Sequence, residues 1–123
     1  MGKRIISRRR GRGTRRYTAL SHRYFAKPKH RSDILNRTCF GKVVDLVHSP
    51  SHSARLALVR YDDGEMAYII ASEGIAVGDI IASGKGIEIK RGNVLPLGQI
   101  PEGTLVYNIE GKLGDGGKYV RSS

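Results

Sequence analysis

Twelve lysine and arginine side chains lie within residues 1–31, a segment that contains no aspartate or glutamate. Nine of the twelve are arginines, whose planar guanidinium groups bind phosphate through paired hydrogen bonds and also stack on exposed bases. Residues 32–123 hold 10 basic and 11 acidic side chains. The net charge of +11 is therefore concentrated on a quarter of the chain, which predicts a cationic arm that binds a polyanion and a nearly neutral body that folds.

The candidate contact residues of the arm are its cations and the aromatic and histidine side chains among them. Each cation that neutralises a phosphate releases condensed counterions, so the arm alone could supply strong, salt-dependent affinity. Aromatic rings, among them Phe25, stack on unpaired bases, and histidines add hydrogen bonds to phosphate or sugar. The predicted contact residues in the arm are Arg4, Arg8, Arg9, Arg10, Arg12, Arg15, Arg16, Tyr17, His22, Arg23, Tyr24, Lys27, Lys29, His30 and Arg31.

A charge run of this kind has two simpler interpretations, a solvated tail and a localisation signal. The length of the arm, its arginine bias and its interleaved glycines and aromatics exceed what either needs. A membrane anchor requires an apolar face at helical spacing, which this segment lacks. The sequence also contains neither an apolar run of about 18 residues nor the apolar core of a signal peptide, so we expect a soluble, intracellular protein.

Few residues outside the arm could catalyse a reaction or bind a metal ion. His48 and His52 have the spacing of two ligands on one helical face, but Pro50 between them breaks a helix. The single cysteine, Cys39, excludes a disulfide and is expected to be a small buried residue. The glycines around Gly114 lack the strand, helix and Gly-Lys-Ser/Thr of a phosphate-binding loop. The sequence therefore predicts no enzyme, no cofactor, no metal site and no small-molecule substrate.

The elements that must position the arm are short apolar stretches separated by Gly, Pro and Asp, a pattern typical of antiparallel strands. Asp63-Gly64 predicts a tight hairpin turn between the second and third strands. No amphipathic helix fits between the strands, and the glycines within residues 8–16 argue against a regular helix in the arm. The predicted strands are residues 40–47, 55–61, 66–71, 79–82, 87–90 and 105–110.

Three segments follow from this organisation. Residues 1–37 form a basic RNA-binding arm, of which residues 1–31 are expected to be disordered when free because they cannot bury enough apolar surface. Residues 38–110 form an all-β domain, a small OB-like barrel that carries the extended basic N-terminal arm. Residues 111–123 form a glycine-rich linker or C-terminal extension. A body this small removes only about 60% of its unfolded surface from water, so partner contacts are expected to complete its stability.

Longer motifs make the chain resemble one known family. GNVLPLGQIPEGTLVYNIE spans residues 92–110, SHRY spans residues 21–24, and RGRGT lies in the arm. GKVVDLVHSP, ALVRYDDGE, IIASEGIAVGD and GDGGKYVRSS occur in the same order as in that family. The chain is similar to the universal large-subunit ribosomal protein two (L-two) family, in its archaeal and eukaryotic branch.

The resemblance implies an OB-like barrel that binds large-subunit rRNA, with an arm that threads between RNA segments. It implies a non-catalytic structural constituent of the cytoplasmic ribosome that supports ribosome assembly and translation, with large-subunit rRNA and other ribosomal proteins as partners. The family's glycine-rich segment before its second domain falls on residues 114–121. This segment adds Lys118 and Arg121 to the predicted rRNA-binding residues.

The chain departs from the family pattern at three positions and in length. Ser49 stands where the family usually carries an acid, His52 where it carries an arginine, and Ser72 where it carries a proline. The first two weaken the expectation of an RNA contact from their turn. Family members continue past the RSS sequence into an SH3-like barrel and a basic extension near the peptidyl transferase region, whose functions are not carried over. We expect this chain to be a fragment or one half of a protein made in two pieces.

A second hypothesis is a free-standing OB-type protein that binds single-stranded nucleic acid in a groove on the barrel face. Tyr61 and Tyr68 lie on predicted strands and would be its stacking residues, although packing within or across strands is their simpler role. The two hypotheses differ in what they require of the arm. Loss of residues 1–31 would abolish most binding under the first hypothesis and would spare most of it under the second.

Overall fold

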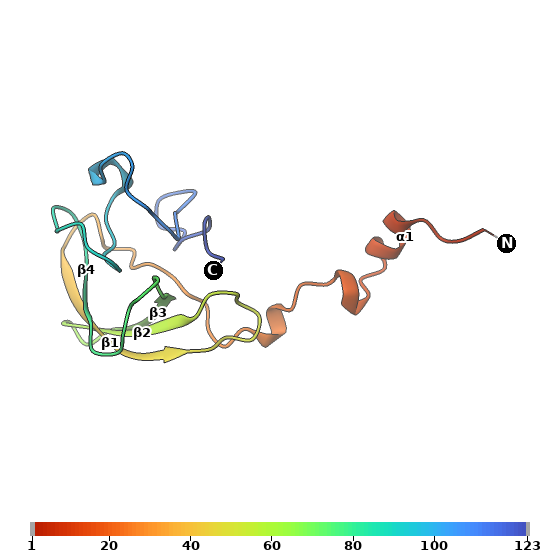
Figure 1. The fold of residues 1–123 in the computed structure, drawn as a ribbon, viewed down its shortest axis with the longest axis horizontal. Helices are drawn as coiled ribbons and strands as arrows, with labels where there is room; N and C mark the ends of the chain where they lie inside the picture. Colours follow the sequence, from red (N-terminus) through yellow and green to blue (C-terminus); the bar gives the residue numbers. More distant parts are fainter. Residues whose placement is uncertain (1, 123) are drawn as a thin grey trace.

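A four-stranded antiparallel sheet forms the centre of the chain in this computed structural model, which describes residues 2–122 (Figure 1). Met1 and Ser123, the outermost residues of the predicted arm and tail, lie outside that range. The strands are β1 (Cys39–Val47), β2 (Leu56–Tyr61), β3 (Met66–Ile70) and β4 (Ile80–Ser83), in the spatial order β3-β2-β1-β4. The first four predicted strands are therefore confirmed, with ends that differ by at most one residue.

The hairpin between β2 and β3 turns at Asp63-Gly64, as predicted. Gly64 has a φ of 87°, a left-handed conformation that side chains other than glycine rarely adopt. Its N–H donates a hydrogen bond of 3.0 Å to the carbonyl of Tyr61. The turn fixes the register of the two strands, in which Arg60 lies directly opposite Met66.

One face of the sheet carries the hydrophobic core. Alternate residues of a strand point to the same face, and the buried ones here are apolar. They are Cys39, Val43, Ala57, Val59, Tyr61, Ile69 and Ile81. A bulge in β1 between Val43 and Asp45 inserts one residue, which keeps Val43 and the half-buried Leu46 on the core face. Cys39 is buried in this core, as the sequence predicted.

Within the described residues, the chain after β4 forms only single bridges and no further strand. The predicted strands at residues 87–90 and 105–110 are wrong, since both segments are irregular and only Ile109 pairs, with Tyr119. A strand needs a sheet edge that satisfies its backbone hydrogen bonds, and these segments lie against none. The remaining elements there are the 3-10 turn η3 (Leu97–Gln99) and a bridge from Val94 to Ser83. The fold of residues 2–122 is thus mostly β, without a closed barrel.

The C-terminal segment, residues 84–122, lies over the core face of the sheet. In Figure 1, β2 and β3 and the end of β1 run along the lower part of the body, with the C-terminal segment above them. An open cleft of about 1720 Å³ separates the sheet from this segment and is lined by apolar side chains that include Leu46, Ile75 and Val106. The opposite face of the sheet, which we call the outer face, carries the exposed side chains of Lys42 and Arg60.

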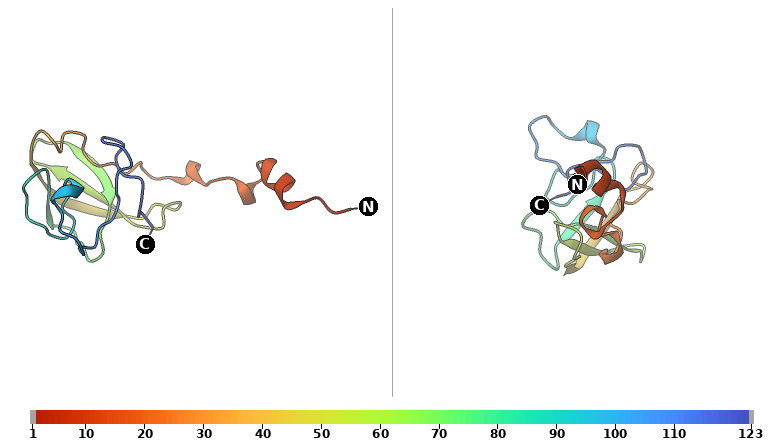
Figure 2. Two further views of the ribbon diagram at one scale, coloured as in Figure 1. Left: turned by 90° about the horizontal axis from the view of Figure 1, so that it is seen from above. Right: turned by 90° about the vertical axis from the view of Figure 1, so that its right-hand side faces the viewer.

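The arm extends away from the body in both lengthwise views (Figures 1 and 2). It contains the helix α1 (Ile6–Gly11) and the 3-10 turns η1 (Arg15–Tyr17) and η2 (Ser21–Arg23). The prediction that residues 8–16 form no regular helix is wrong for the first four of them, which lie in α1. Arginine is a good helix former, and the helix ends only where the glycines begin. None of the residues of α1 is buried, so no contact with the body holds it.

Candidate nucleic-acid interface

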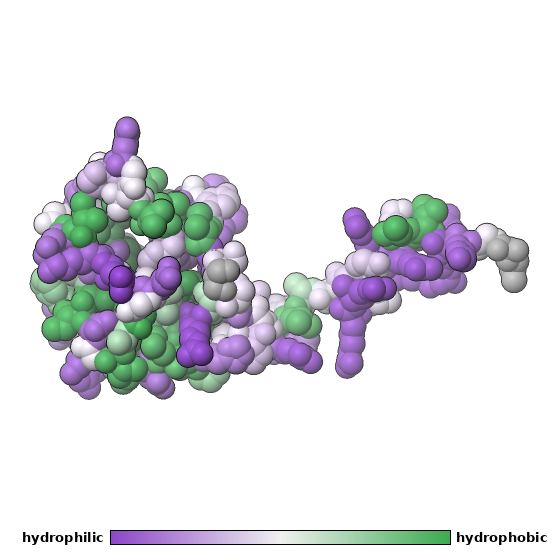
Figure 3. All heavy atoms as spheres, in the orientation of Figure 1, coloured by the Kyte–Doolittle hydropathy of each residue, from purple (hydrophilic) through white to green (hydrophobic). Residues whose placement is uncertain are grey.

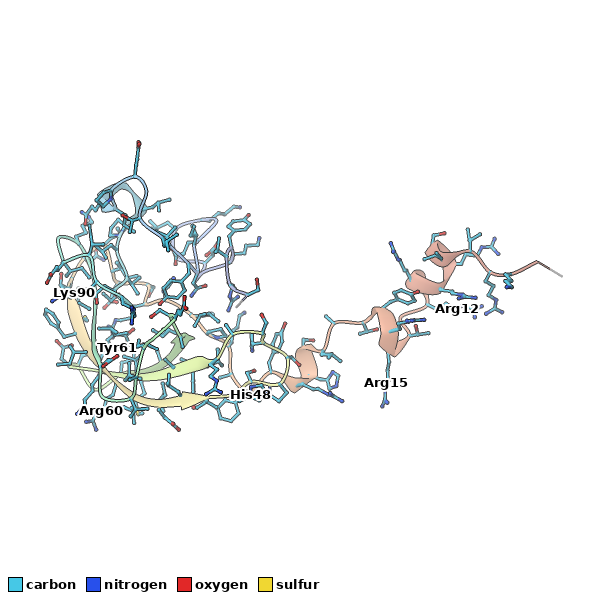
Figure 4. The ribbon with its side chains drawn as sticks, viewed as in Figure 1. Arg12, Arg15, His48, Arg60, Tyr61 and Lys90 are labelled. Atoms are coloured by element: carbon cyan, nitrogen blue, oxygen red, sulfur yellow. The ribbon has the colours of Figure 1, made fainter. Side chains whose placement is uncertain are left out.

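Residues 2–19, which we call the free arm, carry eight of the twelve cations that precede residue 32. Every side chain of the free arm is exposed, and none of its cations forms an ion pair within the described part of the chain. The arm is hydrophilic over most of its surface, and Arg12 and Arg15 project away from the body (Figures 3 and 4). Its charges are therefore free to meet an external polyanion.

Residues 20–31, which we call the docked base, attach the arm to the body. The attachment begins at the loop between β1 and β2. The hydroxyl of Ser51 donates a hydrogen bond of 2.7 Å to the carbonyl of Leu20. The ring of Tyr24 stacks on the ring of His52, with 4.2 Å between the ring centroids. These contacts fix the point at which the free arm leaves the body.

Ser49 is the centre of this attachment and is fully buried. Its hydroxyl oxygen accepts the backbone N–H of Phe25 over 3.2 Å and lies 2.7 Å from Nδ1 of His52. Because the oxygen already accepts from Phe25, the hydroxyl hydrogen can be donated to Nδ1 of a neutral imidazole. Burial lowers the pKa of His52, and the charge of Arg121 lowers it further. Two residues that depart from the family pattern, Ser49 and His52, thus hold the arm in place.

The docked base then passes between the edge of β3 and the C-terminal segment. The backbone N–H of Lys29 donates to the carbonyl of Tyr68, and that of His30 donates to the carbonyl of Gly116, both over 3.0 Å. The His30 ring lies with Nε2 2.7 Å from the carbonyl of Asn108, so this nitrogen carries the hydrogen. His30 is therefore engaged within the protein, whereas the side chain of Lys29 remains exposed.

Arg31 ends the docked base in a cluster of charges. Its guanidinium lies 2.7 Å from Asp33, 2.8 Å from Asp63 and 2.8 Å from Glu65, and 4.7 Å above the ring of Tyr61. The hydrogen bonds to Asp33 and Asp63 hold the pKa of Arg31 above its ordinary value, and Arg31 holds the pKa of both carboxyl groups below theirs.

The side chain of Arg31 is only 5% exposed, so it is not available to a phosphate in this structure. Its sequence-based assignment as an RNA contact is therefore corrected: it anchors the arm to the β2–β3 turn. Tyr61 beneath it is 3% exposed and packs in the core, which removes it as a stacking residue of the second hypothesis.

The glycine-rich loop at residues 111–117 satisfies its own backbone. Five of its N–H groups donate to the carboxylates of Glu110 and Asp115 over 2.9–3.2 Å. These carboxylates occupy the positions that a phosphate would need, so the loop can meet RNA only through neighbouring side chains. Lys118 is exposed, whereas Arg121 is half-buried and its guanidinium lies 3.5 Å from the carbonyl of Gly117.

The structure thus sorts the predicted contact residues by accessibility. The free arm holds Arg4, Arg8, Arg9, Arg10, Arg12, Arg15, Arg16 and Tyr17. The docked base presents exposed side chains of His22, Arg23, Tyr24, Lys27 and Lys29. Lys118 and part of Arg121 are accessible in the C-terminal segment, while His30 and Arg31 are bound within the protein.

Sequence analysis missed two groups of residues. The docking side chains of Ser49, Ser51 and His52 carry no spacing that would mark them. The exposure of Lys42 and Arg60 could have been predicted, because each alternates with apolar residues on a predicted strand, but their position opposite each other depends on the pairing of β1 with β2.

Other classes of site find no support among residues 2–122. No group of three or more His, Cys, Asp and Glu side chains there is placed to hold a metal ion. The helices in this part of the chain are too short or too polar to cross a membrane.

Comparison with known proteins agrees with the resemblance in the motifs. Residues 2–83 match the family described as "Ribosomal Proteins L2, RNA binding N-terminal domain", and residues 90–123 match its "C-terminal domain". The chain is 48% identical over 123 residues to "Large ribosomal subunit protein uL2" of Haloquadratum walsbyi, covering 100% of this chain and 51% of the relative. It is 51% identical over 126 residues to the protein of that name from Methanosphaera stadtmanae, covering 100% and 52%.

A protein of the same name from Methanopyrus kandleri is 50% identical over 125 residues, covering 99% of this chain and 51% of the relative. The chain therefore spans about half the length of these relatives. The match to the N-terminal domain covers the arm and all four strands of the sheet. The chain belongs to the ribosomal protein L2 family, and residues 2–83 correspond to the RNA-binding N-terminal domain of that family.

Proposed function

We propose that this chain is a non-catalytic constituent of the large ribosomal subunit, acts within the ribosome in assembly and translation, and binds large-subunit rRNA through its arm. The observation that carries the proposal is the free arm, in which eight cations stand without a single acid or internal ion pair. Such a segment cannot neutralise its own charge, and closely packed phosphates would do so with release of counterions.

The proposed contact surface comprises the free arm, the exposed side chains of the docked base and Lys118. Cationic contacts to phosphates position a protein on RNA without reading its sequence, and Tyr17 and Tyr24 offer rings to unpaired bases. The docked base contributes in a second way, because it fixes where the arm begins relative to the sheet. Catalysis would belong to the RNA.

We also propose that the sheet is part of an OB-like barrel and that other ribosomal proteins cover the open cleft. Both free edges of the sheet already carry a short partner, Lys29 beside β3 and Val94 beside β4, and a barrel would close at these two places. If closure occurs in the assembled subunit, backbone amides of residues 92–95 should exchange hydrogen more slowly there than in the isolated chain. Unchanged exchange would contradict the barrel.

A charge-neutral arm tests the RNA-binding proposal. Replacing Arg8, Arg9, Arg10, Arg12, Arg15 and Arg16 by glutamine removes six exposed cations and leaves the docked base intact. We expect the slope of log affinity against log salt for large-subunit rRNA to fall by roughly 4 to 5, because each phosphate contact contributes about 0.7 to 0.9. The measurement is a salt titration of binding, together with co-sedimentation with large subunits at moderate salt.

Two outcomes would contradict the proposal. If the unaltered chain does not co-sediment with large subunits, the ribosomal assignment is wrong. If the glutamine variant keeps its affinity for short single-stranded RNA, the result favours a free-standing protein that binds single-stranded nucleic acid. A variant with Lys85 and Lys112 replaced by glutamine measures the change in slope for each cation lost from the body, since both are exposed there, and this change should be smaller than that for each cation lost from the arm.

A further inference from the structure

The outer face of the sheet carries a row of four exposed side chains, one from each strand. Strand register places Met66 opposite Arg60, Arg60 opposite Lys42, and Lys42 opposite Ile80. Met66 is 52% exposed and Ile80 is 72% exposed, and both cations are exposed between them. Figure 4 shows Arg60 on the lower side of the sheet, away from Tyr61 and the core. The row therefore crosses the whole sheet and faces solvent.

The two cations of this row lie opposite each other, and neither forms an ion pair among residues 2–122. Like charges in directly opposite positions of two strands destabilise a sheet. The nearest acids in the strand pattern are Asp45 and Asp62, and neither forms an ion pair with Lys42 or Arg60 among residues 2–122. One carboxylate oxygen of Asp45 instead accepts the N–H of Leu46. An external anion between the cations would remove their repulsion.

Apolar side chains surround the cation pair. Phe40 precedes Lys42 by two residues on the same face and is 54% exposed, and Val44 at the bulge is 41% exposed. The solvated side of an antiparallel sheet is normally polar, and exposed apolar patches mark interaction sites. Figure 3 shows hydrophobic groups next to hydrophilic ones along the lower margin of the body. A cation pair beside an accessible phenyl ring offers both a phosphate contact and a stacking platform.

The outer face is also continuous with the arm. Tyr68 is two residues after Met66 on β3 and lies opposite Leu58, as Met66 lies opposite Arg60. Because alternate residues of a strand share a face, Tyr68 belongs to the outer face. The ring of Phe25 in the docked base packs edge-on against Tyr68, with 5.7 Å between the centroids. The sheet row and the arm therefore meet at this pair of aromatics, and one nucleic-acid strand could follow both.

We propose that the outer face is a second RNA-binding surface, which takes a single-stranded stretch with phosphates between Lys42 and Arg60 and an unpaired base on Phe40. The inference rests on the proposed function, because that function makes RNA the polyanion. Charge complementarity selects RNA over a protein surface, since the centre of the patch is two opposed cations that form no ion pair among residues 2–122.

The test compares variants of the full chain in binding a labelled 20-nucleotide mixed-sequence single-stranded RNA and its duplex. K42Q/R60Q should bind the single strand about tenfold more weakly at 0.1 M salt, with a salt slope lower by about 1.4, since each phosphate on a single strand contributes about 0.7. F40A should weaken single-strand binding about tenfold with an unchanged salt slope, and should leave duplex binding unchanged, because stacking needs an unpaired base.

K85Q/K112Q is the matched control, with the same charge loss away from the outer face. Thermal unfolding distinguishes a binding role from a structural one, because K42Q/R60Q removes a repulsion and should not lower the melting temperature. Equal RNA affinity of K42Q/R60Q and K85Q/K112Q overturns the inference and leaves the arm proposal standing. Normal RNA affinity with reduced incorporation into subunits would also overturn it, in favour of a protein-docking face. Failure of the unaltered chain to bind RNA would overturn both this inference and the proposed function of the arm.

Discussion

At the scale of single residues, Arg31 is a structural cation, and its loss should destabilise the body. R31M keeps most of the side-chain length but leaves Asp33, Asp63 and Glu65 with only the half-exposed Arg37, which pairs with Asp33 and Asp63, as a counter-charge. We expect the free energy of unfolding at pH 7 to fall by about 2–3 kcal/mol, the usual effect of removing one partner from a charged hydrogen-bonded cluster. Urea unfolding followed by circular dichroism measures it.

The pH dependence of this difference provides a second check. Arg31 holds the pKa of Asp33 and Asp63 below the ordinary value near 3.8, so their contribution is present above that pH and is lost as pH falls through the lowered values. The difference in the free energy of unfolding between the unaltered chain and R31M should therefore shrink as the pH falls below about 4. R55M, which removes an exposed arginine without an ion pair, should show no such gap. A constant gap across this range would contradict the role given to Arg31.

His52 should make the attachment of the arm sensitive to pH. Its folded pKa lies below the ordinary value of 6.5, so the unfolded or undocked form binds a proton more readily. The docked state is therefore fully favoured above pH 6.5 and loses stability as pH falls from there towards the lowered pKa. We expect the ring proton resonances of Tyr24 to move towards solvent-exposed values between pH 7.5 and 5.

H52F is the control for this titration, because it keeps a ring under Tyr24 but cannot take up a proton. Its Tyr24 resonances should not change with pH over the same range. If the unaltered chain behaves as H52F does, the imidazole does not govern docking.

At the scale of elements, β1 and β2 pack tightly at Gly41, which lies opposite Tyr61 in their antiparallel pairing. A Cβ at Gly41 would lie 2.5 Å from Cγ1 of Val59 and 2.9 Å from Cδ1 of Tyr61, both in the core. G41A should therefore lower the free energy of unfolding by about 1–3 kcal/mol, the cost of overpacking a filled core. G98A, in open space on η3, should change it by less than about 0.5 kcal/mol. Thermal unfolding of the two variants measures the difference. Equal stabilities would show that Val59 and Tyr61 can move to accommodate a methyl group at residue 41.

The strands that could be predicted from the sequence are those whose partners lie next to them along the chain. β2 and β3 are joined by a turn with its own chemical signature, and β1 shows the alternation of a strand with one buried face. Residues 87–90 and 105–110 have strand-like composition, but a strand also requires a free edge, which composition does not encode. Leu105, 99% exposed, illustrates an apolar residue without a partner.

At the scale of the whole molecule, charge counting located the arm but not its internal division. Arg8 and Arg31 are equivalent in composition, yet one is free and the other is enclosed by residues 63 and 65, which are distant in sequence. The boundary at residue 20 depends on single serine and histidine contacts, which no periodic pattern reveals. Family resemblance supplied the identity of the RNA, whereas the register of the sheet was needed to bring Lys42 and Arg60 together.

The position of that boundary also sets a capture distance for assembly. Eighteen residues beyond a fixed point can span at most roughly 60 Å when extended at about 3.3–3.6 Å per residue. The tip of the arm can thus contact RNA well before the sheet comes within reach of it. Because first encounters through an extended charged segment raise association rates, the anchor at Leu20 would, under the proposed function, determine how early the protein joins a growing particle.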